Sequence, residues 1–168
     1  MSLTPFFYLI HTDPDTGKAQ RVAPYILRNN DSKELVPAEL WWYNGTHNVF
    51  AMLGTNTRDD SFDPISGIHT GVPYDCVPVI EEIFKDDDDD EFKEYPWRWI
   101  SLSDLYIETI EHPSVENPDY LELSTESPYI DNPLIGVYNR AMKFVDIWFD
   151  GWEINEKRSE CKLVYCCV

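Results

Sequence analysis

Basic residues are scarce in this sequence. The 168 residues include 13 Lys and Arg against 31 Asp and Glu, which gives a net charge of −18. A surface with this excess of carboxylates repels nucleic acid and anionic membranes, and it attracts basic protein surfaces over a Debye length of about 10 Å. We therefore expect no direct binding to nucleic acid or to a membrane, and a basic protein as the partner.

Long apolar runs are also absent. No segment approaches the roughly 18 consecutive apolar residues of a membrane-spanning helix. The first ten residues lack the basic start and the long apolar stretch of a secretory signal peptide. Both absences predict a cytoplasmic protein.

Signatures of metal, cofactor and catalytic sites are missing too. The four cysteines show neither paired C-x-x-C spacing nor the density of a disulfide scaffold, so we predict free thiols. The four histidines share no metal-binding spacing, and no G-x-S-x-G segment or phosphate-binding glycine loop occurs. We predict no metal, no cofactor and no catalytic residue. The sequence favours a protein that is not an enzyme.

Apolar and aromatic residues are nevertheless plentiful. The chain is 43% hydrophobic and 14% aromatic, which indicates a packed interior rather than disorder. Its length suits one domain with a substantial core. We predict a single acidic domain over residues 1–168.

Two hairpins are predicted near the start of the chain. Residues 6–10 and 20–27 flank a segment of turn-forming residues, Asp-Pro-Asp-Thr-Gly. Residues 39–43 and 47–53 flank Asn44-Gly45, which tolerates the positive φ values of a tight turn. Residues 54–78, rich in Gly, Pro, Asn and Asp, then predict a long ordered loop or a few short turns.

Helical patterns follow in the second half. One or two helical turns are expected at 79–84. In a second helix, Leu102, Leu105 and Tyr106 lie on one face, and Ser101 is a suitable N-cap with Asp104 three residues later. This helix should end before Pro113.

The last third predicts one more helix and two strands. Asn132-Pro133 can open a helix to about residue 142. Residues 144–149 and 162–166 are mostly aromatic and β-branched, which favours strands. Together the patterns predict the α+β class, with a mostly antiparallel sheet and few short helices.

The negative charge is concentrated after residue 80. Residues 81–153 hold 20 of the acidic residues against five basic ones. The run of Asp86, Asp87, Asp88, Asp89, Asp90 and Glu91 allows three interpretations: a solvated loop without a specific role, weak cation binding, or a surface that imitates nucleic acid. A specific calcium site is disfavoured because the alternating ligands and central glycine of an EF-hand are absent.

A stripe of carboxylates continues this signal. Asp104, Glu108 and Glu111 follow i, i+4, i+7 spacing and should line one side of their helix. They would repeat about every 5 Å, against about 3.4 Å per phosphate along one DNA strand. The stripe is consistent with imitation of nucleic acid, and equally with any amphipathic helix of an acidic protein.

Two tryptophans flank Arg98 directly after the acidic run. Trp97 and Trp99 are either core residues or anchors of a protein interface, where Trp, Tyr and Arg carry much of the binding energy.

Four short segments occur in order along the chain: residues 49–59 (VFAMLGTNTRD), 65–78 (ISGIHTGVPYDCVP), 99–105 (WISLSDL) and 145–151 (VDIWFDG). They resemble the motifs L-F-A-x-L-x-x-x-R-N, I-S-x-P-R-G-L-P-x-D-x-S, W-L-T-L-x-E-L and V-x-x-W-F-D-N. These motifs belong to a group of phage and prophage proteins with no established reaction. The resemblance spans about residues 47–151 and implies a phage accessory protein that acts in the cytoplasm of an infected cell.

The chain departs from these motifs at two places. Polar His and Ser residues that precede W-L-T-L in the group are replaced by residues 95–98 (YPWR), and the Arg before G-L-P is replaced by Thr70. Any activity that depends on those polar residues is expected to be lost or changed here.

Three functions are consistent with this sequence. The first is a phage-encoded inhibitor that occupies the basic cleft of a host nucleic-acid-handling defence protein, with the acidic run, the helical stripe and the two tryptophans as its contacts. The second is a pocket protein that sequesters or degrades a nucleotide immune signal, with Arg58, His69 and Asp75 lining the pocket. The third is a structural virion or assembly protein.

Overall fold

A five-stranded antiparallel sheet forms the centre of the fold, in the order β2-β1-β7-β6-β5. The structure is a computed structural model and describes residues 4–28, 31, 33–40, 46–55, 64–111, 134–149 and 154–168. The strands of this sheet are β1 (Pro5–Thr12), β2 (Ala19–Arg21), β5 (His69–Thr70), β6 (Arg98–Ser101) and β7 (Cys161–Cys167). As predicted, the chain is a single α+β domain with a mostly antiparallel sheet.

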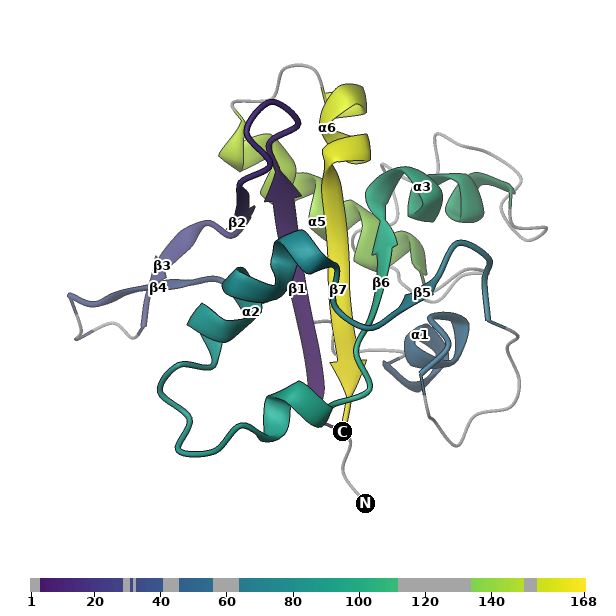
Figure 1. Ribbon diagram of the computed structural model, residues 1–168. Coiled ribbons are helices and arrows are strands. Elements are labelled where there is room, and N and C mark those ends of the chain that lie inside the picture. The colour runs from purple at the N-terminus through teal and green to yellow at the C-terminus, as the bar shows by residue number, and fades with distance from the viewer. Residues whose placement is uncertain are drawn as a thin grey trace.

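Strands β1 and β7 lie side by side at the centre, although they come from opposite ends of the sequence (Figure 1). Their register pairs Pro5 with Cys167 and His11 with Cys161. All residues of β7 except Lys162 are buried, because both faces of the sheet are covered there. The prediction of a strand at 162–166 is confirmed.

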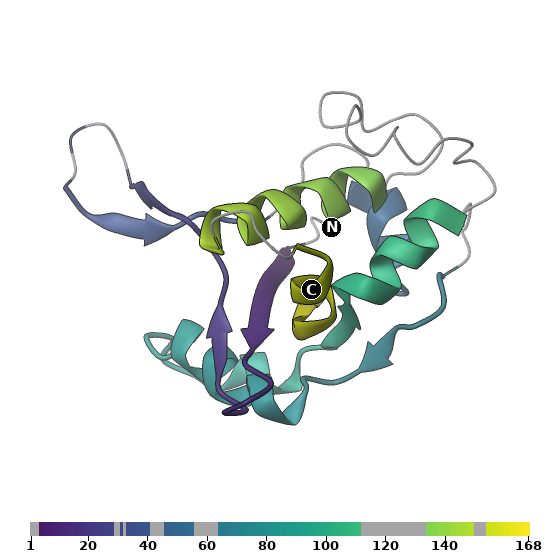
Figure 2. The same cartoon turned by 90° about the horizontal axis from the view of Figure 1, so that it is seen from above.

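Helices cover the two faces unequally (Figures 1 and 2). We call the face packed against α1, α3 and α5 the helical face, and the face packed against α2 and η2 the aromatic face. Alternation along β7 separates them, since Leu163 and Tyr165 belong to the first core and Val164 and Cys166 to the second. The remaining elements are α1 (Thr46–Met52), η1 (Tyr74–Cys76), α2 (Val77–Ile83), η2 (Glu91–Glu94), α3 (Leu102–Glu111), α5 (Leu134–Trp148) and α6 (Ile154–Glu160).

Two helix predictions are confirmed by their local contacts. The hydroxyl oxygen of Ser101 accepts a hydrogen bond from the backbone N–H of Asp104 at 3.1 Å, the N-cap expected for α3. Helix α2 covers the predicted turns at 79–84 and starts with Pro78 in its first turn. None of the described helices is long and apolar enough to cross a membrane.

The first hairpin forms as β1 and β2, with Gly17 in the turn at a φ of 71°. However, the chain leaves the sheet after β2. Strand β3 (Tyr25–Leu27) pairs with β4 (Leu35–Pro37) in a separate two-stranded sheet. This pair, which we call the arm, projects from the body of the molecule in both views (Figures 1 and 2).

The prediction of a second hairpin is wrong. Its second strand, at 47–53, lies in helix α1, while its turn at 44–45 lies outside the described residues. The helix ends in a Schellman motif, in which Gly54, at a φ of 73°, donates to Ala51 O and Thr55 donates to Phe50 O. The side chains from Val49 to Leu53 are all buried, and such an uninterrupted apolar run shows no period that separates a strand from a helix.

The strand predicted at 144–149 is also wrong, because α5 continues to Trp148. Phe144 and Val145 are buried, whereas Asp146 and Ile147 are exposed. The buried positions continue the three- and four-residue spacing of the helix. Helical packing outweighs the β-propensity of these aromatic and β-branched residues.

The predicted loop at 54–78 contains strand β5 and the short helix η1. Residues 56–63 of that loop lie outside the described residues.

Candidate functional site

The aromatic face of the sheet is built from rings that pack on one another. The Trp97 ring lies within 6.3 Å of four others, measured between centroids, and its Nε1–H donates a 2.6 Å hydrogen bond to the buried Phe92 carbonyl. Phe84 stacks on Phe92 at 5.0 Å. The rings around Trp97 are Phe6, Tyr8, Phe84 and Tyr95. This cluster fixes α2 and η2 on the sheet.

The acidic run connects α2 to η2 on this same face. All of residues 86–91 are exposed. Residues 81–94 contain nine Asp and Glu and two lysines. Lys85 Nζ contacts Glu82 at 2.6 Å, and Lys93 Nζ contacts Asp90 at 3.6 Å. Both lysines are thus engaged with local carboxylates, and the segment remains strongly negative.

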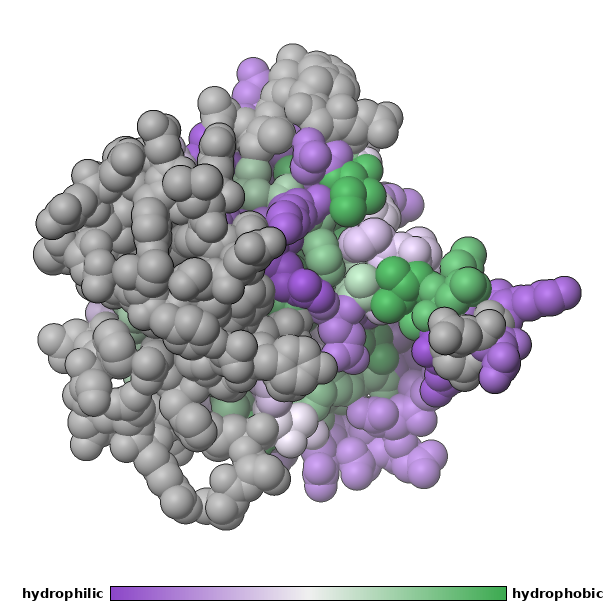
Figure 3. Space-filling view, turned by 180° about the vertical axis from the view of Figure 1, so that it is seen from behind, coloured by the Kyte–Doolittle hydropathy of each residue, from purple (hydrophilic) through white to green (hydrophobic). Residues whose placement is uncertain are grey.

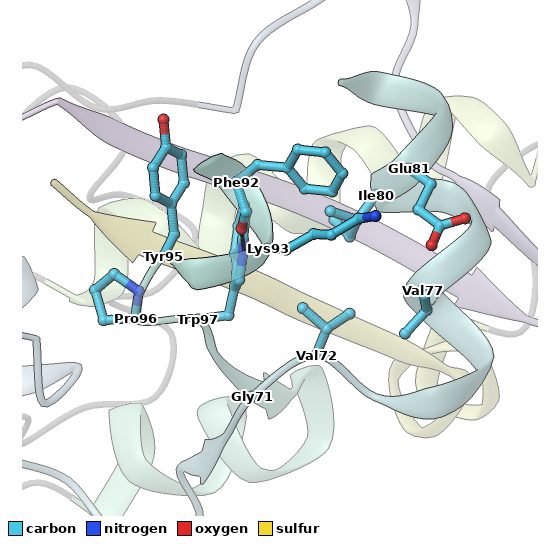
Figure 4. Close-up of a pocket in the computed structure, with 10 residues that line it drawn as sticks. All are labelled: Gly71, Val72, Val77, Ile80, Glu81, Phe92, Lys93, Tyr95, Pro96 and Trp97. Atoms are coloured by element: carbon cyan, nitrogen blue, oxygen red, sulfur yellow. Dashed lines mark hydrogen bonds between the residues drawn. The ribbon is translucent and has the colours of Figure 1, made fainter. Parts of the chain in front are cut away.

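An apolar pocket of about 470 Å³ opens between α2, η2 and the chain that enters β6 (Figure 4). Trp97 and Ile80 are buried in its wall, and Val77 at its edge is 36% exposed. Lys93 extends toward Glu81 in Figure 4. The lining residues are Gly71, Val72, Val77, Ile80, Glu81, Phe92, Lys93, Tyr95, Pro96 and Trp97.

A polar depression of about 240 Å³ adjoins the apolar pocket. The two hollows share Glu81, Phe92 and Lys93, and the depression also contacts Asp87 and Asp90 of the acidic run. The carboxylates and the apolar pocket are therefore parts of one continuous surface. We call this surface the acidic pocket site.

The carboxylate stripe of α3 does not join this surface. Helix α3 packs in the core of the helical face, through Leu102 and Leu105. Asp104 and Glu108 are partly buried, and Glu108 accepts a hydrogen bond from the Ser66 hydroxyl. Glu111 ends the helix, and its side chain lies outside the described residues. The structure thus separates the run and the stripe, which adjoin in sequence, onto opposite faces of the sheet.

The two tryptophans have different surroundings. Trp97 is buried, with 5% of its surface exposed, so it forms the wall of the pocket rather than a protruding anchor. Trp99 is partly buried and stacks on His69 with ring centroids 4.1 Å apart. Lys162 Nζ lies 5.7 Å from the centre of the Trp99 ring.

The residues predicted for a nucleotide pocket are only partly described. Arg58 lies outside the described residues. His69 stacks on Trp99, and Asp75 accepts hydrogen bonds from the Thr12 hydroxyl at 2.6 Å and from Lys162 Nζ at 3.1 Å. Neither His69 nor Asp75 lines the apolar pocket.

The contacts of Asp75 shift its titration and that of the neighbouring thiol. Burial by itself raises the pKa of the Asp75 carboxyl, but the bonds from Thr12 and Lys162 outweigh it and hold the pKa below its usual value. Burial, together with the negative charge of Asp75, raises the pKa of the Cys76 thiol to about 12. Cys76 is thereby kept as an unreactive thiol, and Asp75 is an ionised carboxylate that fastens η1 to the sheet.

All four cysteines are free and buried, as predicted for their pairing state. Among the residues that the structure describes, no three His, Cys, Asp or Glu side chains come together as a metal site.

Comparison with known proteins adds no relative, since no family model, curated protein or solved structure matches this chain.

The apolar pocket was not predicted from the sequence. Its lining comes from three separate segments, residues 71–72, 77–81 and 92–97. The sequence shows only a weak sign of it: Val77, Ile80 and Glu81 share one face of α2 through i, i+3, i+4 spacing.

Proposed function

We propose that this protein is a phage-encoded acidic inhibitor that binds a host nucleic-acid-handling protein, such as a defence nuclease, in its basic cleft. The phage origin is inferred from the motif resemblance between residues 47 and 151. The mode of binding is inferred from one observation: the exposed acidic run is continuous with an apolar pocket.

The charge of the site suits a basic partner. Proteins that bind nucleic acid carry clustered Lys and Arg side chains in the groove that holds the phosphates. The exposed carboxylates of residues 86–91 present acceptor oxygens of the same sign to such a groove. Long-range attraction between the two surfaces accelerates their encounter.

The apolar pocket supplies binding affinity that the charges alone do not. Exposed ion pairs contribute little to affinity, whereas an apolar or aromatic side chain that fills a preformed pocket can dominate it. We infer that an apolar side chain of the target, flanked by Lys or Arg, enters the pocket between Val77 and Tyr95. The neighbouring carboxylates then contact the flanking cations.

A matched pair of variants tests this proposal. Asp87→Asn with Asp88→Asn removes two charges from the run and leaves Asp89 and Asp90, whose carboxylates contact Glu91 N–H and Lys93. Asp146→Asn with Glu156→Gln removes two exposed charges elsewhere. Each tagged protein is incubated with nuclease-treated host extract, and the retained proteins are identified.

We expect one nucleic-acid-binding host protein to be retained by the wild type and by the control pair. Its affinity for the Asp87/Asp88 pair should fall at least about tenfold, which corresponds to about 1.4 kcal/mol. Added duplex DNA or RNA should release it, and binding should weaken steeply between about 0.1 M and about 0.5 M salt. Retention that resists nucleic acid and salt, equal loss in both variants, or no retained protein would each contradict the proposal.

A further inference from the structure

The arm exposes an unusual number of large apolar side chains. Tyr25, Ile26, Leu27 and Leu35 are 63%, 50%, 54% and 60% exposed. Consecutive residues of a strand point to opposite faces, so the three residues of β3 leave both faces of the arm apolar. Figure 3 shows hydrophobic side chains gathered on the projecting part of the molecule.

Such an arm is unfavourable in isolation. A two-stranded hairpin alone is at best marginally stable in water. Exposed contiguous apolar surface on an otherwise polar protein marks an interaction site. We therefore expect a partner surface to cover the arm.

A groove of about 640 Å³ lies at the base of the arm. It is bounded by β1 on one side and by the arm's own Val36 and Pro37 on the other. Arg21, whose guanidinium lies 5.0 Å from the centre of the Tyr8 ring, forms part of its wall. The other lining residues are Thr4, Pro5, Phe6, Phe7, Arg28, Glu39 and Ile83. Each molecule thus carries an apolar projection and a hollow next to each other.

The charge of this region differs from that of the rest of the chain. Residues 18–37 contain four basic and two acidic residues, in a chain of net charge −18. Two copies of the protein repel each other least where they approach through this region. The groove reaches α2 through Ile83, but it shares no lining residue with the acidic pocket site.

We propose that the occupant of the arm and its groove is a second copy of this chain. In a two-fold dimer, the arm of each copy lies in the groove at the base of the other copy's arm. Such an interface requires one self-complementary patch per copy, which the adjacent projection and hollow provide. The acidic pocket site remains free in the dimer to bind a target.

The oligomeric state of the purified protein tests this inference. We expect light scattering coupled to size-exclusion chromatography to give a dimer mass that falls toward the monomer mass on dilution from about 100 μM to about 1 μM. Ile26→Asp should weaken the dimer about 100-fold, because a two-fold interface contains the substitution twice. Ile107→Asp on α3 is the matched control, since Ile26 and Ile107 are 50% and 46% exposed, and it should leave the dimer unchanged.

Further measurements on the variants and at different salt concentrations complete the test. Circular dichroism checks that Ile26→Asp is folded, and Leu27→Asp should repeat its effect. The dimer should tighten as salt rises from about 0.05 M to about 0.5 M, because salt screens the repulsion between two acidic copies. Target binding at the acidic pocket site should change in the opposite direction.

A wild-type protein that is monomeric over the whole concentration range would overturn the inference, and the arm would then serve a different protein. A dimer that survives both arm substitutions would overturn it too. Either result would leave the proposed inhibition through residues 86–91 untouched.

Discussion

The two faces of the central sheet bury different cores, and the helices that cover them differ in length. The helical face is covered by α5 and α3, which have 15 and 10 residues, together with the seven-residue α1, and its core is largely aliphatic. The aromatic face is covered by α2 and η2, which have seven and four residues, and its core is built from stacked rings. Helices this short are not stable alone in water. Their attachment depends on the aromatic cluster beneath them.

This difference explains why the candidate site lies where it does. Two long helices pack on the helical face, whereas the short elements α2 and η2 border the pocket on the aromatic face. The loop that joins them is free to hold the acidic run in solvent. Segments with few buried contacts are also those from which binding surfaces are commonly drawn.

Truncation of Trp97 should have the largest effect on stability. Trp97→Ala removes a ring with four aromatic neighbours and its hydrogen bond to Phe92 O, so we expect a loss of about 3–5 kcal/mol in the free energy of unfolding. Leu105→Ala in the core of the helical face should cost about 3 kcal/mol. Urea unfolding measures both.

The two substitutions should differ in where they act. Hydrogen exchange should rise across residues 77–94 in Trp97→Ala, while α5 keeps most of its protection. The proposed contrast between the faces is wrong if Trp97→Ala lowers the free energy of unfolding by less than about 1 kcal/mol. It is also wrong if protection from hydrogen exchange falls equally on both faces.

The second prediction concerns Asp75, which fastens η1 to the aromatic face. Its pKa in the folded protein is below the usual value. The stability it contributes is therefore present above the unfolded pKa of about 4 and is lost as the pH falls through the folded value. Asp75→Asn should lower the urea midpoint at pH 7 and flatten its decline between about pH 5 and about pH 2.

A graded variant makes this prediction sharper. Thr12→Val removes the hydrogen bond from Thr12 to the carboxylate and keeps the one from Lys162, so its acid dependence should be intermediate. An Asp75→Asn protein with the wild-type pH profile would show that the carboxylate does not hold η1.

The smallest effect is expected from the acidic run itself, and its sign is opposite. Like charges on consecutive exposed residues repel, so Asp87→Asn with Asp88→Asn should slightly raise the urea midpoint at low salt. The gain should vanish at about 1 M salt, where the Debye length is about 3 Å.

The control pair should not show this gain. Glu156 lies in the first turn of α6, where a carboxylate interacts favourably with the helix dipole. Asp146 lies in the last turn of α5, where a carboxylate interacts unfavourably with the helix dipole, so the two substitutions offset each other and the midpoint should stay unchanged. A gain in both variants would mean that net charge, rather than the crowding of the run, sets the effect.

The sequence determined several elements through local signals alone. The N-cap of α3, the proline in the first turn of α2 and the turn before β2 each depend on side-chain and backbone contacts within a few residues. The class, an antiparallel α+β domain, followed from their sum. The exposure of residues 86–91 also followed, because consecutive carboxylates cannot all be buried.

Tertiary packing decided whether ambiguous apolar segments became strands or helices, and on which surface each charged segment lies. Residues 47–53 and 144–149 are apolar enough for a strand or a helix. They form helices because their apolar side chains pack on the helical face of the sheet. The acidic run and the α3 stripe adjoin in sequence, yet β6 lies between them and directs them to opposite faces of the sheet. The pocket joins three separate segments, and only the packing of α2 and η2 on the sheet brings them together. The sequence therefore determined where along the chain each charge lies. The packing of helices on the sheet determined the surface to which that charge belongs.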